Sequence, residues 1–234
     1  MYELHIANKN YSSWSLRPWV LLTVLGIPFK ERLHWFQPDN AAFKSFSPSA
    51  LVPALVDGPE NDKVTIWDSL AIAEYVAESH PQVWPEAKAA RAFARSAAAE
   101  MHSGFSTLRG TCSMSVGIRV KLNDTSPALL RDLARIDAIW NDGFTRFGGP
   151  YIAGGQYTAV DAFYAPVVFR IQTYGLGFDL SPTARAYVDR ILALPAMQAW
   201  YEAGLAETTR DVPHEAEIAA SGEIIADYRA APAP

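Results

Sequence analysis

Over its first part the chain alternates between strand and helix patterns. The apolar positions from Tyr2 to Ile6 alternate with polar ones, as in a half-buried strand. The segments with strand character are 2–7, 29–35, 54–57 and 64–67. One helix pattern follows the first segment and ends at Gly26, and another follows the last segment and ends before Pro81. This order predicts a small α/β sheet domain over residues 1–80.

From about residue 88 the strand pattern stops, and apolar residues recur at steps of three and four. One such series contains Met101, Phe105 and Leu108 and predicts one long helix, and a second series spans 129–147. Further helices are expected at 159–174, 183–194 and 196–207. Residues 88–234 therefore predict an all-helical domain.

Composition narrows the class of protein. Half of the 234 residues are hydrophobic, which is enough for a sizeable core. The net charge of −5 and the lack of a basic run give no reason to expect nucleic acid as a partner. The single cysteine, Cys112, excludes an internal disulfide and fits a reducing compartment. With no signal-like leader and no apolar stretch of roughly 18 residues, we expect a cytoplasmic protein without membrane contact.

Three serines crowd the point where the first strand passes into the first helix. Ser12, Ser13 and Ser15 lie just before or within the first turn of that helix. The backbone N–H groups of a helix N-terminus are unpaired, and the helix dipole there favours negative charge. The serine turn can therefore cap the helix or hold a negatively charged reacting atom, and the turn alone does not decide between the two.

Two further motifs allow either a structural or a binding role. Pro53 enters a strand, where it either marks a strand start or forms a cis peptide that turns the Val52 backbone toward an extended ligand. Asp68 and Ser69 begin a helix as an ordinary cap. Alternatively, Asp68 meets a ligand ammonium while Ser69 and the helix amides receive a carboxylate. The zwitterionic end of an amino acid would satisfy both groups.

Other polar residues are interpreted as structural. Thr158 and Asp161 match a capping box, which predicts a buried, hydrogen-bonded Asp161 at the start of a core helix. The five histidines show no metal-ligand spacing, so no metal site is expected. Cys112 has no neighbouring base in the sequence and is expected to be a packed thiol.

Taken together, these features resemble a cytosolic glutathione S-transferase over nearly the whole chain. The markers, in order, are the serine turn, the Val52-Pro53 pair, segment 67–72 and segment 158–161. The resemblance implies a thioredoxin-like N-terminal domain followed by an all-helical domain. It also implies glutathione as co-substrate, a small-molecule electrophile as second substrate, and a homodimer.

The resemblance also implies roles for individual residues. In this family the proline after Val is cis, the Val backbone pairs with the cysteinyl part of glutathione, and an acidic-Ser pair binds the γ-glutamyl end. The positions that match this pattern are Val52, Pro53, Asp68 and Ser69. The serine turn is similar to the zeta-class pattern Ser-Ser-Cys-Ser-x-Arg, with Trp14 in place of the cysteine. Ser12, and after it Ser13, is then the expected partner of the glutathione sulfur.

Two parts of the expected site have weaker sequence support. Many relatives carry Gln or Lys where this chain has Leu51, so the glycine carboxylate of glutathione needs another partner. The candidates for that partner are Lys44 and Gln37. The candidates for an apolar electrophile wall are Met101, Phe105 and Leu108, and their helical spacing fits plain core packing equally well.

Three functions remain open at this point. The first is a glutathione transferase that conjugates small apolar electrophiles or reduces peroxides. The second is a glutathione-dependent cis–trans isomerase of the maleylacetoacetate type, which the serine turn favours and Trp14 disfavours. The third is a non-catalytic binding or scaffold protein of the same fold, which Leu51 keeps open. An enzyme is favoured over a scaffold.

Overall fold

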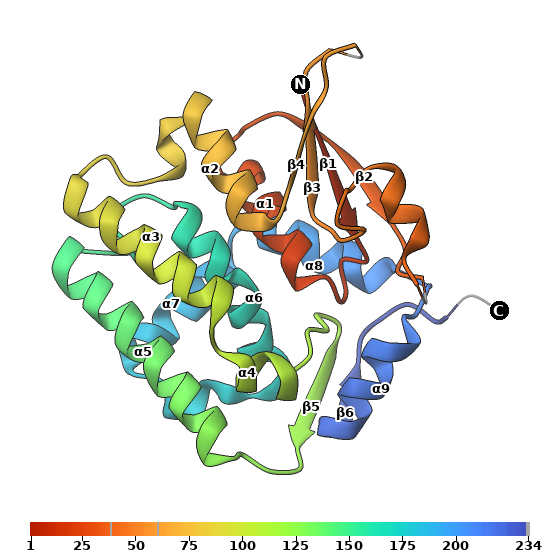
Figure 1. Cartoon of the computed structure of the whole chain (residues 1–234). Coiled ribbons are helices and arrows are strands. Elements are labelled where there is room, and N and C mark those ends of the chain that lie inside the picture. The colour runs from red at the N-terminus through yellow and green to blue at the C-terminus, as the bar shows by residue number, and fades with distance from the viewer. Residues whose placement is uncertain (38, 60, 233–234) are drawn as a thin grey trace.

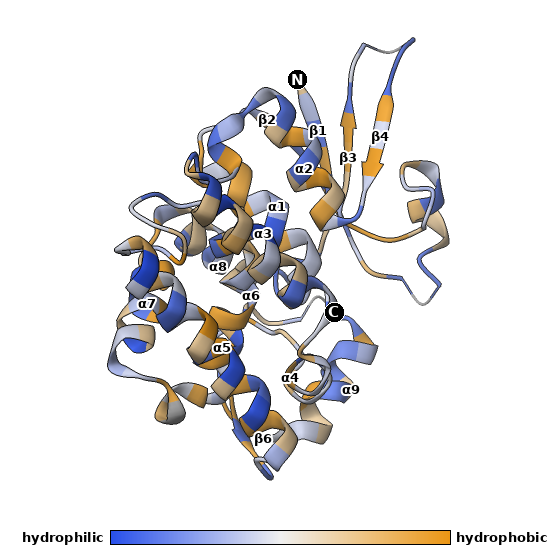
Figure 2. Ribbon diagram, turned by 60° about the vertical axis from the view of Figure 1, so that its left-hand side comes forward, coloured by the Kyte–Doolittle hydropathy of each residue, from blue (hydrophilic) through white to orange (hydrophobic). Residues whose placement is uncertain are grey.

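Four strands form a mixed sheet in the first part of the chain, in the order β2-β1-β3-β4 (Figure 1). The computed structural model describes residues 1–37, 39–59 and 61–232. The strands are β1 (Tyr2–Ala7), β2 (Phe29–His34), β3 (Ala54–Asp57) and β4 (Val64–Trp67). β1 pairs parallel with β2 and antiparallel with β3, and β3 pairs antiparallel with β4. Figure 2 shows β3 and β4 as largely hydrophobic, and the hairpin predicted from the sequence is confirmed.

The first helix of this part lies between the two halves of the molecule. The helices here are α1 (Ser13–Val24), the 3-10 helix η1 (Ala41–Ser45) and α2 (Ser69–Ser79). α1 packs against α2 on its own side and against α6 (Ala159–Tyr174) and α8 (Pro195–Ala206) of the second half. The N-terminus of α1, where the serines lie, is therefore fixed between both halves.

Helices make up most of the second part (Figure 1). Besides α6 and α8, they are α3 (Lys88–Ser103), α4 (Ser106–Thr111), α5 (Pro127–Phe147), α7 (Pro182–Leu192) and α9 (Val212–Ser221), with 3-10 helices η2 (Pro81–Val83) and η3 (Leu176–Asp179). Nearly every residue of α6 is buried, so this helix is the centre of the bundle. None of the helices in the described part of the chain combines the length and hydropathy that crossing a membrane requires.

The second part also contains a two-stranded sheet, which the sequence analysis missed. β5 (Ile118–Leu122) pairs antiparallel with β6 (Gly222–Asp227). Ile118 and Val120 are buried while Lys121 is exposed, so β5 has the alternation of a half-buried strand. The second domain is helical as predicted, apart from this small sheet. The alternation was present in the sequence, but its strand partner lies about a hundred residues away along the chain.

The long helix predicted through Leu108 is divided into two helices in the structure. The structure ends α3 at Ser103 and begins α4 at Ser106. Gly104 lies so close to the carbonyl oxygen of Glu100 that a Cβ would stand 2.7 Å from it. Phe105 follows in the left-handed region, with φ of 55°, which a continuous helix excludes. The break turns α4 away from the axis of α3.

The capping box at the start of α6 is confirmed, and its contribution to the stability of the fold can be tested. The Asp161 carboxylate is fully buried and accepts hydrogen bonds from Ile152 N, Thr158 N and the Tyr187 hydroxyl at 3.0, 3.0 and 3.1 Å. Burial raises the pKa of Asp161 to about 6, and the hydrogen bonds act in the opposite direction.

Replacing Asp161 by Ala should lower the free energy of unfolding by roughly 3 kcal/mol or more, because buried donors lose their acceptor. Urea denaturation measures this change. Asp142→Ala is the matched control, since its side chain is 52% exposed and pairs only with Arg146, one turn away. Its effect should stay within about 0.5 kcal/mol. Equal effects of the two substitutions would contradict the role given to Asp161.

Candidate active site

The serine turn caps α1 in the structure. The Ser12 side chain accepts a hydrogen bond from Ser15 N at 3.4 Å and donates to Ser15 Oγ at 2.7 Å. Ser15 Oγ also accepts from Ala7 N at 3.1 Å, which connects the end of β1 to the start of α1. Ser13 is the first residue of α1 and is half-buried. The helix-cap interpretation of these serines is therefore confirmed, and a role toward a ligand remains compatible with it.

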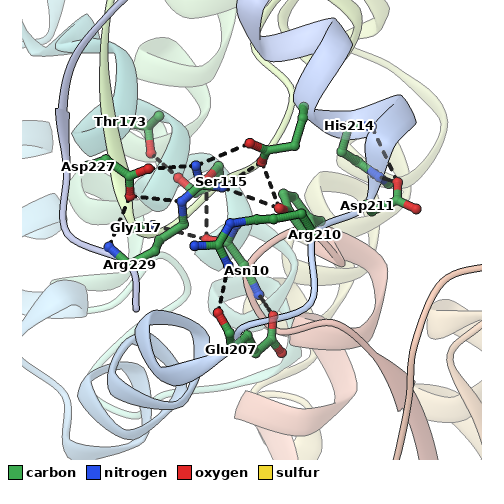
Figure 3. Close-up of polar contacts among 12 residues, drawn as sticks. Asn10, Ser115, Gly117, Thr173, Glu207, Arg210, Asp211, His214, Asp227 and Arg229 are labelled. Carbon is green, nitrogen blue, oxygen red and sulfur yellow. Dashed lines mark hydrogen bonds and ion pairs between the residues drawn. The ribbon is translucent and has the colours of Figure 1, made fainter. Parts of the chain in front are cut away.

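The loop just before the serine turn is held by the second half of the molecule (Figure 3). The Glu207 carboxylate accepts hydrogen bonds from Lys9 N at 2.5 Å and Asn10 N at 3.1 Å. Asn10 Oδ1 in turn accepts from the Ser115 hydroxyl at 3.2 Å and from Gly117 N at 3.1 Å. Glu207, Lys9 and Asn10 are all buried. These bonds fix where Ser12 lies relative to the helical half.

A first cavity, of about 380 Å³, opens beside Ser12. Its polar and backbone lining brings together residues expected from the sequence: Ser12, Val52, Pro53, Asp68 and Ser69. Aromatic side chains complete it: Trp14, Phe36, Phe43, Trp67 and His214. Leu51 lies at the rim with 63% of its surface exposed. The cavity thus gathers backbone, hydroxyl and carboxylate groups from β1–α1, the β3 entrance and the start of α2.

The binding motifs around this cavity have unusual backbone geometry. The Val52–Pro53 peptide bond is cis. Asp68 has φ of 75°, a left-handed conformation that costs a residue other than glycine about 1–3 kcal/mol. Its carboxylate caps α2 through Leu70 N at 2.7 Å and lies 3.4 Å from His102 Nε2. Asp68 is exposed and presents its negative charge to solvent, whereas the neutral hydroxyl of Ser69 is buried.

A second cavity, of about 540 Å³, adjoins the first on the helical side. Its lining includes Tyr11, Ser13, Ser103, Ser106, Arg109, Ser113, Arg170 and Glu217. Trp14 and His214 line both cavities, so these two side chains mark the junction between them. The lining of the second cavity is polar and charged, not the apolar surface that the sequence predicted.

Guanidinium groups gather around Trp14. The Arg17 guanidinium carbon lies 4.2 Å from the Trp14 ring centre, and that of Arg109 lies 4.9 Å from it. Arg17 and Arg170 are buried, and burial lowers their pKa values to about 9 and about 10. Within the described residues, no carboxylate forms an ion pair with Arg17, Arg109 or Arg170. Arg17 Nε is buried without a hydrogen-bond partner there.

Several residues expected in the site lie elsewhere. Met101 and Leu108 are completely buried and Phe105 is 7% exposed; all three belong to the core and line neither cavity. The break at Gly104 explains this, because it leaves the α3–α4 corner facing the cavity with Ser103 and Ser106 instead. Lys44 and Gln37 are exposed and also line neither cavity.

Sequence reasoning missed Arg109, Arg170, His214 and Glu217. No local motif distinguishes these four residues, because they meet only through the packing of α4, α6 and α9 against the serine turn. Cys112 is buried, and burial raises the pKa of its thiol to about 12, so it is a packed thiol as expected. Among the described residues, no three His, Cys, Asp or Glu side chains are grouped so that they could hold a metal ion.

Comparison with known proteins identifies the family. A model of the glutathione S-transferase N-terminal domain matches residues 11–79, and a model of the C-terminal domain matches residues 122–203. The chain belongs to the glutathione S-transferase family. The thioredoxin-like sheet domain followed by a helical domain is the fold of this family.

Two curated relatives of this chain have the same name. The first is a probable maleylacetoacetate isomerase of Vibrio cholerae, 27% identical over 163 residues, covering 67% of this chain and 74% of that protein. The second is a probable maleylacetoacetate isomerase of Caenorhabditis elegans, 25% identical over 198 residues, covering 80% of this chain and 87% of that protein.

Solved structures share the fold. A Burkholderia glutathione transferase homologue with bound glutathione has a TM-score of 0.63 and 21% identity, covering 87% of this chain and 97% of that chain. The maleylacetoacetate isomerase of Anaeromyxobacter dehalogenans, with glutathione in its active site, has a TM-score of 0.61 and 21% identity. The match covers 86% of this chain and 94% of that chain.

The contact between Glu207 and the loop before Ser12 can be tested. Glu207→Ala leaves the N–H groups of Lys9 and Asn10 buried without an acceptor, which should cost roughly 2–4 kcal/mol of stability. Ser12 also loses its fixed position, so the backbone amide resonances of the serine turn should shift. Urea denaturation and NMR measure the two effects. Glu202→Ala, exposed on α8, is the control and should change neither. If Glu207→Ala behaved like the wild type in both measurements, the role given to Glu207 would be refuted.

Proposed function

We propose that this protein is an enzyme that forms the thiolate of glutathione at Ser12 and adds it to a small electrophile carrying a carboxylate. The observation that carries the proposal is the pair Arg109 and Arg170, which line the second cavity without a carboxylate partner among the described residues. The electrophile expected from the sequence was apolar, and these charges favour an anionic one instead.

The first cavity has the groups that glutathione requires. In the proposed pose, the Val52 backbone pairs with the cysteinyl part, while Asp68 attracts the γ-glutamyl ammonium and Ser69 donates to its carboxylate. The Arg17 guanidinium lies behind Ser69, with Nη1 3.4 Å from Ser69 Oγ, and adds positive charge on the carboxylate side. The glycine end points toward the rim at Leu51, where the described lining offers Ser49 and Asn40 as polar neighbours.

The serine turn supplies the chemistry of the thiolate. The unpaired N–H groups and the dipole of α1 favour negative charge at its N-terminus. If the Ser12 hydroxyl rotates away from Ser15 Oγ, it can donate to the sulfur. A hydrogen bond to the charged form lowers the pKa of the glutathione thiol, and the thiolate is the nucleophile. Positioning the thiolate beside the second cavity adds the benefit of orientation.

The electrophile would be held by charge. Arg109 and Arg170 share the second cavity with a single lining carboxylate, Glu217, whose Oε2 accepts from Ser113 at 2.8 Å. A substrate carboxylate placed between the two guanidinium groups would form charge-assisted hydrogen bonds with them. It would also offset the mutual repulsion of cations that the fold buries together.

A second candidate is the cis–trans isomerisation of a maleyl diketo acid. Both curated relatives are called probable maleylacetoacetate isomerases, and such a substrate carries the carboxylates that Arg109 and Arg170 favour. The two reactions share the thiolate addition and differ in whether the thiolate leaves again. A coupled assay with a maleyl diketo acid separates them, because a purely conjugating enzyme accumulates adduct and forms no trans isomer.

Ser12→Ala tests the thiolate site. Loss of one hydrogen-bond donor to the developing charge should lower turnover about 10²-fold, with a stability loss of about 1 kcal/mol from the missing cap. Steady-state kinetics with saturating glutathione measure the first effect. Ser13→Ala is the matched control and should have a smaller effect. Turnover at the wild-type rate in Ser12→Ala would remove Ser12 from the mechanism, and absence of glutathione binding to the wild type would favour a scaffold.

Arg109→Gln tests the charge of the electrophile. The KM for a carboxylate-bearing electrophile should rise roughly 10- to 100-fold, because a hydrogen-bonded charge partner is lost. The rate with a neutral aryl halide should stay within about twofold of the wild-type value, since that substrate makes no ion pair. Arg131→Gln, on the exposed face of α5, is the control. A uniform loss with both substrates would indicate a structural role and count against the anionic substrate.

A further inference from the structure

His214 lies where the two cavities meet. It is on α9, near the end of the described chain, and it lines the cavity of Ser12 and Val52 as well as that of Arg109 and Arg170. Its side chain is 27% exposed, so it is accessible without being free in solvent. A group at this junction lies beside both the expected sulfur and the expected electrophile.

The imidazole of His214 is held in one orientation. The rings of Tyr11 and Phe36 both stack with it, each with 5.2 Å between ring centres. Its Nδ1 lies 2.5 Å from Oδ2 of Asp211, and that carboxylate is only 10% exposed (Figure 3). With two aromatic rings stacked on the imidazole and Nδ1 on Asp211, its remaining polar atom is Nε2. Nε2 forms no hydrogen bond within the described part of the chain.

Helix α9 is itself tied to the serine turn. The Tyr11 hydroxyl donates to Glu215 Oε1 at 2.6 Å, and Arg229 bridges Glu215 and Asp227 through its guanidinium. The Arg229 side chain is 3% exposed, whereas those of Glu215 and Asp227 are 30% and 42% exposed. The strand that follows α9, β6, pairs with β5. His214 is thus positioned by contacts of α9 with both halves of the molecule.

We propose that His214, oriented by Asp211, is the proton acceptor and donor of the reaction at this site. A carboxylate on Nδ1 holds the proton on that nitrogen, so Nε2 keeps a lone pair and can act as a base. The inference rests on the proposed function, since it assigns a proton path to the same thiol. It adds a residue from α9 to a site otherwise built from the serine turn, α2 and the helices α4 and α6.

The proton balance is simple. Nε2 accepts the proton of the glutathione thiol; the S–H bond breaks and sulfur keeps the electron pair. The thiolate then adds to an alkene conjugated with a carbonyl, and the π electrons move to the carbonyl oxygen as an enolate. In conjugation, the imidazolium returns its proton to the enolate carbon. In isomerisation, the thiolate leaves after rotation, the double bond re-forms, and the imidazolium returns its proton to the sulfur.

Charged groups face His214 from several elements. Asp211 lies on Nδ1, and Tyr11, bonded to Glu215, covers one face. Across the cavities lie Arg109, Arg170 and Glu217 on one side and Asp68 on the other.

Two substitutions test the dyad. His214→Gln removes the base, and its turnover near pH 7 should fall on the order of 10²-fold while glutathione still binds. Asp211→Asn keeps an oxygen on both the helix cap and Nδ1, because Asp211 Oδ2 faces His214 N as well as Nδ1, but it removes the negative charge beside the ring, so turnover should fall in the same direction. His214→Gln should lose the acidic limb of the pH–rate profile, and Asp211→Asn should shift it. His80→Gln, in the linker between the halves, is the control and should keep it.

A measurement on the wild-type protein needs no substitution. The ring resonances of His214 are followed by NMR in the free protein, with glutathione, and with S-methylglutathione. Glutathione should protonate the ring near neutral pH, whereas S-methylglutathione, which has no thiol proton, should not. Identical ring shifts with the two ligands, or wild-type pH profiles in both variants, would overturn the dyad while leaving the transferase proposal intact. Absence of glutathione binding to the wild type would overturn both.

Discussion

The site depends on one buried carboxylate that joins the two halves of the molecule. Glu207, at the end of α8, accepts hydrogen bonds from the backbone N–H groups of Lys9 and Asn10, which would otherwise lack partners between the halves. The loop that follows β1 is therefore shaped by the helical half before it reaches Ser12. Burial raises the pKa of Glu207, while the hydrogen bonds from both amides lower it. The serine turn has its geometry because a distant helix holds the preceding loop.

Local sequence signals were sufficient to predict the helices, strands and caps that depend on neighbouring residues. The strand alternation from Tyr2, the caps at Ser12 and Asp68 and the capping box at Thr158 depend on neighbouring residues, and all appear in the structure. The wall of the second cavity depends on which side chains α4, α6 and α9 bring together. A helical period places Met101 on an apolar face but does not reveal that the chain turns at Gly104. That turn decides which side chains face the cavity.

Desolvated cations give the helical half its chemical character. Removing a guanidinium from water without a carboxylate partner is costly, and Arg17 and Arg170 both lie in that situation within the described residues. Part of the cost is offset by aromatic faces, with Trp14 and Phe163 flanking Arg17. Carbonyl oxygens offset another part of this cost, because Cys112 O accepts a hydrogen bond from Arg170 Nε at 2.7 Å. The charges are stabilised but not neutralised, which leaves the surrounding field positive.

The shared boundary of the two cavities has a consequence for binding equilibria. Trp14 and His214 line both, so a molecule in one cavity contacts the side chains that shape the other. Any such influence between binding sites is reciprocal, because it is a single coupling free energy. A change that filling one cavity makes in affinity at the other is matched by an equal change in the opposite direction of the cycle. Occupancy of the two cavities is therefore one linked equilibrium.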